Sequence, residues 1–374
     1  MKTTILIISS ILLIIASCSS DKSVKKDTNK SNSSEIELGK EIKITQLPAN
    51  DYKRLKGTIG DYPITMEFIK MDSDISGEYY YDKTQAPILI SGELNQGKKV
   101  VFNEYAETPT PTGVFNGEFY SDGSFRGTWT NPKTKKTLEV KLTRQPSKIL
   151  SFENTLLNKE KCHVKKQSII INGKRMDGGD TLCSNIKLQG INVKCEDPTL
   201  EKTINDLIEM ESANMFGEAT TYSETYELLE ETSYEEGFDI EINTIVNAIY
   251  KNFISIEVSC YSYYYHRAHP NSYTTIINID LNTGKPIYFE DLIKSESMNI
   301  LVETSKPIFE AMYGGEEEGW FIYDQFALPK NFAIEANGLY FHYNSYEIGP
   351  YTQGAPSVLI PYSKIKGTLK DILK

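Results

Sequence analysis

Short runs of alternating polar and apolar residues, separated by turn clusters, occupy residues 44–146. A period of two residues is typical of strands that are buried on one face only. Asp122-Gly123 lies between two of these runs and favours a hairpin turn, because glycine accepts a positive φ. The region is therefore predicted to be an antiparallel β meander of roughly six to eight strands, forming an open barrel or a curved sheet.

A weak internal repeat runs through these strands. Glycine stands two positions before a bulky apolar residue at four places: Gly77 and Tyr79, Gly92 and Leu94, Gly117 and Phe119, and Gly127 and Trp129. Glycine inside a strand is typical of a bulge or of a close approach between two backbones. We expect the bulky residue of each pair to face the core.

The N-terminus has the features of a bacterial signal sequence. A positive start at Met1-Lys2 precedes a mostly apolar run over residues 5–15, which is too short for a folded helix to span ~30 Å of hydrocarbon. The run ends in Ile15-Ala16-Ser17-Cys18, which resembles the lipobox of bacterial lipoproteins. This resemblance implies that residues 1–17 are removed and that the Cys18 thiol is acylated. The alternative is an ordinary cleaved signal peptide with a chance cysteine.

The residues after the lipobox predict how the chain is held at the membrane. Residues 18–43 are rich in Ser, Lys and Asn, with few large apolar side chains, and we expect a disordered tether. No second apolar span follows, so the lipid is expected to be the anchor. Ser19 is not the Asp that resembles an inner-membrane retention signal, which favours the outer membrane as the site in the cell envelope.

Charge is distributed unevenly along the chain. Residues 201–374 contain 11 Lys and Arg against 27 Asp and Glu, and residues 201–250 contain one lysine against thirteen acids. Such an acidic half argues against nucleic acid as a partner. Two interpretations remain open: a solvated helix face, or a surface that attracts a cationic protein or ions.

Residues 147–237 combine strand and helix signals. Val164–Ile171 and Ser184–Asn192 resemble strands, and Asn172-Gly173 is a turn signal. Asp197-Pro198 favours a helix start, because Asp caps helices and Pro suits the first helical position. Four apolar residues follow on one face at helical spacing: Leu200, Ile204, Leu207 and Ile208. This region is predicted to be an α+β segment.

Four cysteines remain besides Cys18, in a compartment that is expected to be oxidising: Cys162, Cys183, Cys195 and Cys260. A two-residue turn at Asn172-Gly173 would place Cys162 opposite Cys183 in a non-hydrogen-bonded pair, where Cα atoms lie ~4.5 Å apart. That separation suits a disulfide. The glycines of Met176–Asp180 could instead break the second strand and shift the register. The partners of Cys195 and Cys260 stay open.

Residues 238–374 predict an α+β domain. Ile256, Val258, Cys260 and Tyr264 fall on the apolar side of an alternating run. Gly284 and Asn337-Gly338 are turn signals. Glu290-Asp291 precedes a helical pattern, and carboxylates favour the positive end of a helix dipole.

Three stretches of this last region resemble the C-terminal domain family of RsiV-type proteins, domain of unknown function 3298. They are Tyr264–Pro270, Ile279–Ile293 and Gly338–Lys366. The chain differs from the family where His266-Arg267 replaces the usual glycines. Residues 147–237 resemble, more faintly, the domain that precedes it in the peptidoglycan deacetylase PdaC.

The resemblance has functional implications. The outer domain of RsiV-type proteins binds lysozyme, which implies lysozyme or peptidoglycan as an envelope ligand here. Because a signal sequence is expected at the N-terminus, we do not expect an anti-sigma segment before it. The deacetylase chemistry belongs to a separate domain that this chain lacks. We therefore expect a non-enzymatic binding module; the alternatives are a cell-wall enzyme or accessory with an unrecognised site, and a structural envelope component.

The candidate ligand-binding residues lie in the stretches that resemble the family: His269, Tyr264, Tyr346 and Tyr351. His266 and His269 could bind zinc, but a good site needs further ligands, and nothing in the sequence brings His163 or His342 to them. The other interpretation is that His269 ends a strand and bonds to the backbone. No nucleophile elbow, phosphate loop, CxxC or dinucleotide motif is present. No metal and no cofactor are expected.

Overall fold

A computed structural model describes residues 42–48, 50–71, 73–84, 86–94, 99–105, 110–215, 237–265, 267–314 and 326–373. Residues 42–374 form one compact unit. These described residues are mostly β, with 55% in strands and few in helices. This confirms an N-terminal antiparallel β module followed by an α+β region.

The N-terminal module is a barrel of eight antiparallel strands. They are β2 (Asp51–Ile59), β3 (Tyr62–Met71), β4 (Asp74–Tyr81), β5 (Pro87–Leu94), β6 (Lys99–Tyr105), β7 (Gly113–Tyr120), β8 (Phe125–Thr130) and β9 (Thr137–Arg144). Each strand pairs with the next, and β2 also pairs with β9, from Leu55↔Arg144 to Ile59↔Val140. The barrel is thus closed, which corrects the expectation of an open barrel or a curved sheet. A short strand, β1 (Ile44–Thr45), pairs with β7.

Glycines of the internal repeat let neighbouring backbones of the barrel approach closely. Gly117 faces Gly127 across β7 and β8, and a Cβ on Gly127 would lie 2.2 Å from the Asn116 carbonyl oxygen. A Cβ on Gly77 would lie equally close, 2.2 Å, to the Glu67 carbonyl oxygen. Close approach of neighbouring strands at glycines helps a small sheet to bend and close into a barrel. The barrel core is rich in phenylalanine: Phe68, Phe102, Phe115, Phe119 and Phe125 are buried.

A long hairpin follows the barrel. It consists of β10 (Ile149–Ile171) and β11 (Lys174–Cys195), far longer than the short strands expected there. Asn172 and Gly173 have φ values of 52° and 75°, as a two-residue turn with both central residues left-handed requires. The register pairs Ile171 with Lys174 and Cys162 with Cys183, so the glycines of residues 176–180 do not shift it.

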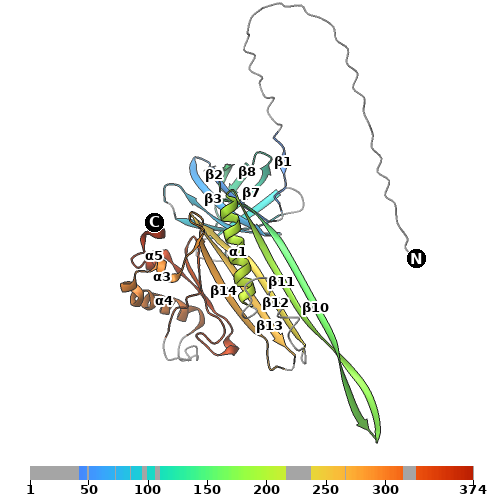
Figure 1. Cartoon of the computed structure of the whole chain (residues 1–374). Coiled ribbons are helices and arrows are strands. Elements are labelled where there is room, and N and C mark those ends of the chain that lie inside the picture. Colours follow the sequence, from blue (N-terminus) through green and yellow to red (C-terminus); the bar gives the residue numbers. More distant parts are fainter. Residues whose placement is uncertain are drawn as a thin grey trace, which may run out of the picture. The chain divides into compact units, whose positions relative to one another are not determined.

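This hairpin joins the barrel to a second sheet region. β10 pairs with β2 through Ser151↔Asp51, and β11 pairs in parallel with β12 (Phe238–Tyr250) from Ser184 to Gln189. From Cys183 towards the turn at Asn172-Gly173, β11 pairs with β10 alone among the described strands. Figure 1 shows these two strands in green. The sheet then continues antiparallel through β13 (Phe253–Tyr264), β14 (Asn271–Asp280) and β15 (Lys285–Pro286).

Helix α1 (Pro198–Asn214) connects β11 to β12 and packs on the sheet. The Asp197 side chain caps it by accepting a hydrogen bond from the Thr199 N–H at 2.8 Å, as predicted. Its apolar face shares one core with the sheet; Leu200, Ile204 and Ile208 are buried and Leu207 is partly buried. The thiols of Cys195 and Cys260 are free and buried in this core.

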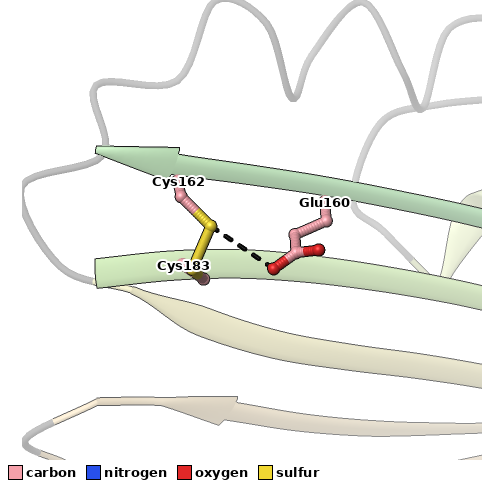
Figure 2. Close-up of side chains that lie close together, drawn as sticks. All are labelled: Glu160, Cys162 and Cys183. Atoms are coloured by element: carbon pink, nitrogen blue, oxygen red, sulfur yellow. Dashed lines mark hydrogen bonds between the residues drawn. A yellow bond between two sulfur atoms is a disulfide. The ribbon is translucent and has the colours of Figure 1, made fainter. Parts of the chain in front are cut away.

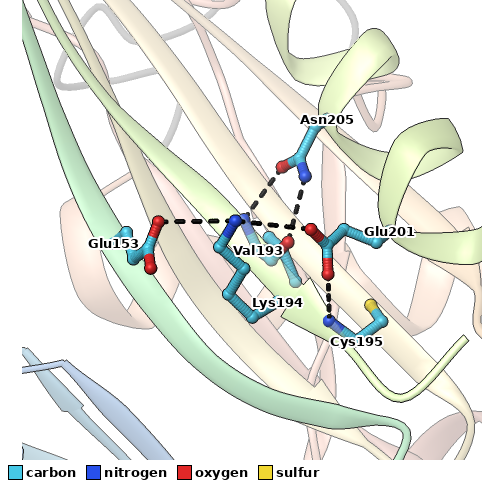
Figure 3. A network of polar contacts seen from close by, with 6 residues as sticks. All are labelled: Glu153, Val193, Lys194, Cys195, Glu201 and Asn205. Atoms are coloured by element: carbon cyan, nitrogen blue, oxygen red, sulfur yellow. Dashed lines mark hydrogen bonds and ion pairs between the residues drawn. The ribbon is translucent and has the colours of Figure 1, made fainter. Parts of the chain in front are cut away.

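Polar side chains fix α1 against β11 (Figure 3). The Asn205 amide accepts from the Val193 N–H at 2.8 Å and donates to the Val193 carbonyl at 3.0 Å. Glu201 accepts from the Cys195 N–H at 3.0 Å and pairs with Lys194 at 3.3 Å. The helix therefore satisfies backbone groups on the edge of β11 that faces away from β10, where pairing with β12 has ended.

The remaining elements form a smaller α+β layer with its own core. They are α3 (Phe289–Leu292), α4 (Met298–Tyr313), β16 (Phe332–Ile334), β17 (Gly338–His342), β18 (Ser357–Pro361) and α5 (Tyr362–Ile365), with short 3₁₀ turns at Ser295–Ser297, Tyr351–Gln353 and Asp371–Leu373. The helix expected from Glu290 is interrupted, because Ile293 is extended and bridges to Leu369. Among the described residues, none of the helices has the length and apolar character needed to cross a membrane.

Candidate functional site

Two loops bring three of the candidate ligand-binding residues together. His269 follows β13, and Tyr346 and Tyr351 lie between β17 and β18. The His269 and Tyr351 rings stack with centroids 4.0 Å apart, and the Tyr346 ring lies 5.7 Å from that of Tyr351. His269, Tyr346 and Tyr351 therefore lie next to one another in the structure.

A backbone carbonyl ties these two loops together. The Tyr351 hydroxyl donates a hydrogen bond of 2.7 Å to the Pro270 carbonyl oxygen, and His269 Nδ1 lies 2.8 Å from the same oxygen. Since a carbonyl only accepts, Nδ1 carries the proton in this contact. His269 therefore bonds to the backbone, as one interpretation predicted, but it lies in the turn between β13 and β14 and not at the end of a strand.

Asparagine side chains hold the second loop against the edge of β14. Asn344 Oδ1 accepts from the Thr274 N–H at 2.7 Å, and its Nδ2 donates to the Thr274 carbonyl at 3.0 Å. Asn331, which directly precedes β16, bonds in the same way to the Ile276 N–H and the Thr274 carbonyl. These amides take the place of a neighbouring strand. Their role is not visible in the sequence, because asparagine in a loop usually indicates a turn.

Tyr346 has a backbone conformation that is rare for its residue type. Its φ is +71°, in the left-handed region, and its side chain is 49% exposed. A bulky residue there carries conformational strain of about 1 kcal/mol, which the surrounding loop must offset. Strain retained at an exposed ring is a typical feature of binding surfaces.

Tyr264 lies near His269 and adds a fourth residue to this group. Its position differs from the one that the alternation within its strand predicts. We expected it on the apolar face of its strand, but it is 45% exposed at the end of β13, where its ring contacts Phe238 at 5.6 Å. Together with Arg267 and His269 it lines an open hollow of ≈ 460 Å³. We call His269, Tyr264, Tyr346 and Tyr351 the aromatic surface.

Comparison with known proteins identifies part of this region. A family model described as "Protein of unknown function (DUF3298)" matches residues 290–363. Residues 290–363 are a DUF3298 domain. Tyr346 and Tyr351 lie inside it, whereas Tyr264 and His269 lie before its first residue.

Two solved structures of the DUF3298 family are similar to the chain. One is from Bacteroides fragilis, with 19% identity and a TM-score of 0.45, and the other from Pseudomonas aeruginosa, with 18% identity and a TM-score of 0.46. Each comparison covers 59% of this chain and 96% of the other. No curated protein matches the sequence.

The aromatic surface, which lies partly within the DUF3298 domain, has side chains that are suited to recognition. Tyrosine and histidine rings offer apolar faces, while their hydroxyl and ring nitrogen atoms offer hydrogen bonds. Tyrosine and arginine are also enriched where proteins bind one another. The exposed rings, with Arg267 beside them, therefore favour contact with a ligand over a role in the core.

The other site predictions fall elsewhere. Cys18 and His266 lie outside the described residues. His342 lies in β17, where burial lowers the pKa of its imidazole. In the described part of the chain, one group gathers three metal-binding atoms within 4.8 Å, that of Glu160, Cys162 and Cys183. Its two sulfur atoms form a disulfide, which removes the thiolates that a metal would need (Figure 2).

Proposed function

We propose that this chain is a non-enzymatic cell-envelope protein that is anchored by lipid at Cys18 and binds an envelope ligand through the aromatic surface. The observation that supports this proposal is the cluster of ring contacts among His269, Tyr346 and Tyr351. The Tyr351 ring is held by its hydrogen bond to the Pro270 carbonyl, and its loop is held by the Asn344 amide, which accepts from the Thr274 N–H of β14. Rigid, exposed aromatic rings lose little conformational entropy on binding.

A cationic envelope protein such as lysozyme is the ligand that the charge pattern favours. Residues 201–374 contain 27 acidic against 11 basic residues. An acidic surface increases the rate at which a cationic partner finds it, and the aromatic rings would supply affinity after the encounter. Peptidoglycan is the other ligand of this proposal, because the ring faces can also pack against sugar rings.

The test is a binding measurement with the full chain in a nonionic detergent. Surface plasmon resonance measures a cationic lysozyme, and co-sedimentation measures purified peptidoglycan. Tyr346→Ala and Tyr264→Ala should each weaken binding of the ligand by about tenfold, as for residues at the centre of an interface. Tyr62→Ala is the matched control, since Tyr62 is 54% exposed on the barrel.

Two outcomes would contradict the proposal. One is that neither lysozyme nor peptidoglycan binds the parent chain. The other is that Tyr62→Ala weakens binding as much as the variants of the aromatic surface, because the effect would then not belong to this surface.

A further inference from the structure

A cavity with three glutamates lies where the barrel meets β12 and the turn between β16 and β17. Its volume is ≈ 310 Å³. Glu67 and Glu78 line it from β3 and β4, and Glu335 lines it from the turn. We call it the glutamate cavity. Its lining residues include no Lys, Arg or His.

Two of the three glutamates lack a compensating positive charge. Glu67 accepts from the Tyr52 hydroxyl at 2.7 Å and pairs with Arg54 at 3.0 Å. Glu78 is only 7% exposed, and in the described part of the chain its carboxyl group has neither a hydrogen-bond donor nor an ion-pair partner. Glu67 and Glu78 are also directly opposite in the β3–β4 register, where like charges repel.

This environment raises the pKa values of Glu78 and Glu335. Burial, followed by the charges of Glu67 and Glu335, raises the pKa of Glu78 to about 8. Burial raises the pKa of Glu335 to about 7. A positive charge inside the cavity would stabilise the ionised form of both groups.

Two amides at the wall add unsatisfied hydrogen-bonding groups. Asn337 Oδ1 and Asn247 Nδ2 are buried without a partner among the described residues. Asn247 is the residue at which the β12–β13 register shifts. A β-bulge of this kind redirects a side chain and is frequent beside binding sites. Asn337 Oδ1 is therefore a free acceptor for a ligand N–H, and Asn247 Nδ2 is a free donor.

The separation of the carboxylates and the nature of the wall indicate which kind of cation the glutamate cavity can bind. A calcium or magnesium ion needs six or more oxygen ligands that converge within a few ångströms. The glutamate cavity does not contain three carboxylates with atoms within 4.8 Å of one another. Most of the remaining wall is apolar and includes Phe68, Ile90 and Ile249, with Ser76 and Ser91 among the polar residues. Separated carboxylates on an apolar wall suit an organic cation better than a metal ion.

We infer that the glutamate cavity binds a small primary ammonium ion on a short alkyl chain. The ammonium group lies between Glu78 and Glu335 and donates to Asn337 Oδ1, and the alkyl chain packs against the apolar wall. This site is separate from the aromatic surface in its residues, and it does not depend on the proposed function.

The experiment measures thermal unfolding of the full chain in a nonionic detergent at about pH 8.5, where Glu78 is mostly ionised. The probe is n-pentylammonium at about 10 mM, and n-pentanol is the neutral control of the same shape. The amine should raise the unfolding midpoint by about 2 °C, and pentanol should not. Equal shifts with both compounds, or no shift with the amine, would overturn the inference.

Substitutions test whether the amine raises the unfolding midpoint by binding in the glutamate cavity. Glu78→Gln keeps the shape of the side chain and should abolish the amine-dependent shift, while Glu139→Gln, at an exposed barrel position, should keep it. If Glu78→Gln does not fold, Glu335→Gln takes its place with the same expected loss. An amine shift that persists in the cavity variant would contradict the inference, as would calcium chloride giving the same shift as the amine.

Discussion

His269 and Tyr351 stack on each other and bond to the same atom, the carbonyl oxygen of Pro270, at 2.8 and 2.7 Å. The turn after β13 and the loop before β18 therefore depend on one acceptor. Any ligand that contacts the Tyr346 ring meets a surface whose position is set by this contact.

Tyr351→Phe removes one of these two hydrogen bonds and leaves the ring stack in place. We expect the free energy of unfolding to fall by about 1 kcal/mol, as for a typical hydrogen bond. Chemical denaturation measures this value. The exchange rate of amide hydrogens in residues 343–356 should also rise. Unchanged exchange in this loop would show that the Tyr351 hydroxyl does not hold it.

The Cys162–Cys183 disulfide is expected to act locally. Its two Cα atoms lie 4.0 Å apart, next to Ser184, where β11 stops pairing with β12. Replacing both cysteines with serine should speed amide exchange in residues 162–183, and leave the barrel strands unchanged, because the two-stranded part has few other contacts. Peptide mapping without reduction checks the pairing first. A linked peptide of Cys183 and Cys195 would contradict it, together with the hairpin register.

Glu78 should make the protein less stable as pH rises. Its pKa in the folded chain is about 8, above its ordinary value, so the folded state binds more protons than the unfolded state between about pH 4.5 and 8. The free energy of unfolding then falls as pH rises through this window. The titratable and charged groups nearby are Glu67, Arg54, Tyr52, Tyr80, Tyr250, Tyr362 and Glu335.

Glu78→Gln should reduce this pH dependence, since it removes the titrating group. Urea unfolding at about pH 6 and pH 8.5 measures the difference, and the variant should be the more stable protein at the higher pH by roughly 1 kcal/mol. Glu139→Gln is the control and should follow the parent. A parent whose stability increases over this range would contradict the assignment of a raised pKa.

Cys18→Ala should release the chain from membranes, because the lipid at Cys18 is the proposed anchor. Fractionation of cells followed by a high-salt wash measures the distribution. Cys260→Ala is a matched control, since this thiol is buried in the sheet core. A Cys18→Ala protein that stays in the washed membrane fraction would show that another segment holds it.

Local signals in the sequence predicted local structure. Asn172-Gly173 determines a two-residue turn, and once that turn is set, every pair out to Cys162 and Cys183 follows by counting. The Asp197 cap and the face of α1 are likewise encoded within a few residues. The tyrosines and His269 were predicted from sequence stretches that resemble a family, and their contacts with one another were not predicted.

Features that join distant residues could not be predicted in this way. Closure of the barrel requires Ile59 to pair with Val140, and alternation within a strand does not name its partner. The glutamate cavity brings Glu78 to Glu335, and nothing near either residue indicates the other. Glutamate in a sequence predicts exposure, so a buried carboxyl group is visible only after the layers have packed.

The β10–β11 hairpin also has a mechanical consequence. Its two paired strands have a length of about 70 Å at the usual rise per residue. A force that separates the strands at their bases would load one pair of hydrogen bonds at a time, so the hairpin would open at low tension. At Cys162 and Cys183 the load would pass to a covalent bond, and the outer end would stay closed. Under such a force the hairpin is thus expected to open near the sheet and to stay paired between the disulfide and the turn.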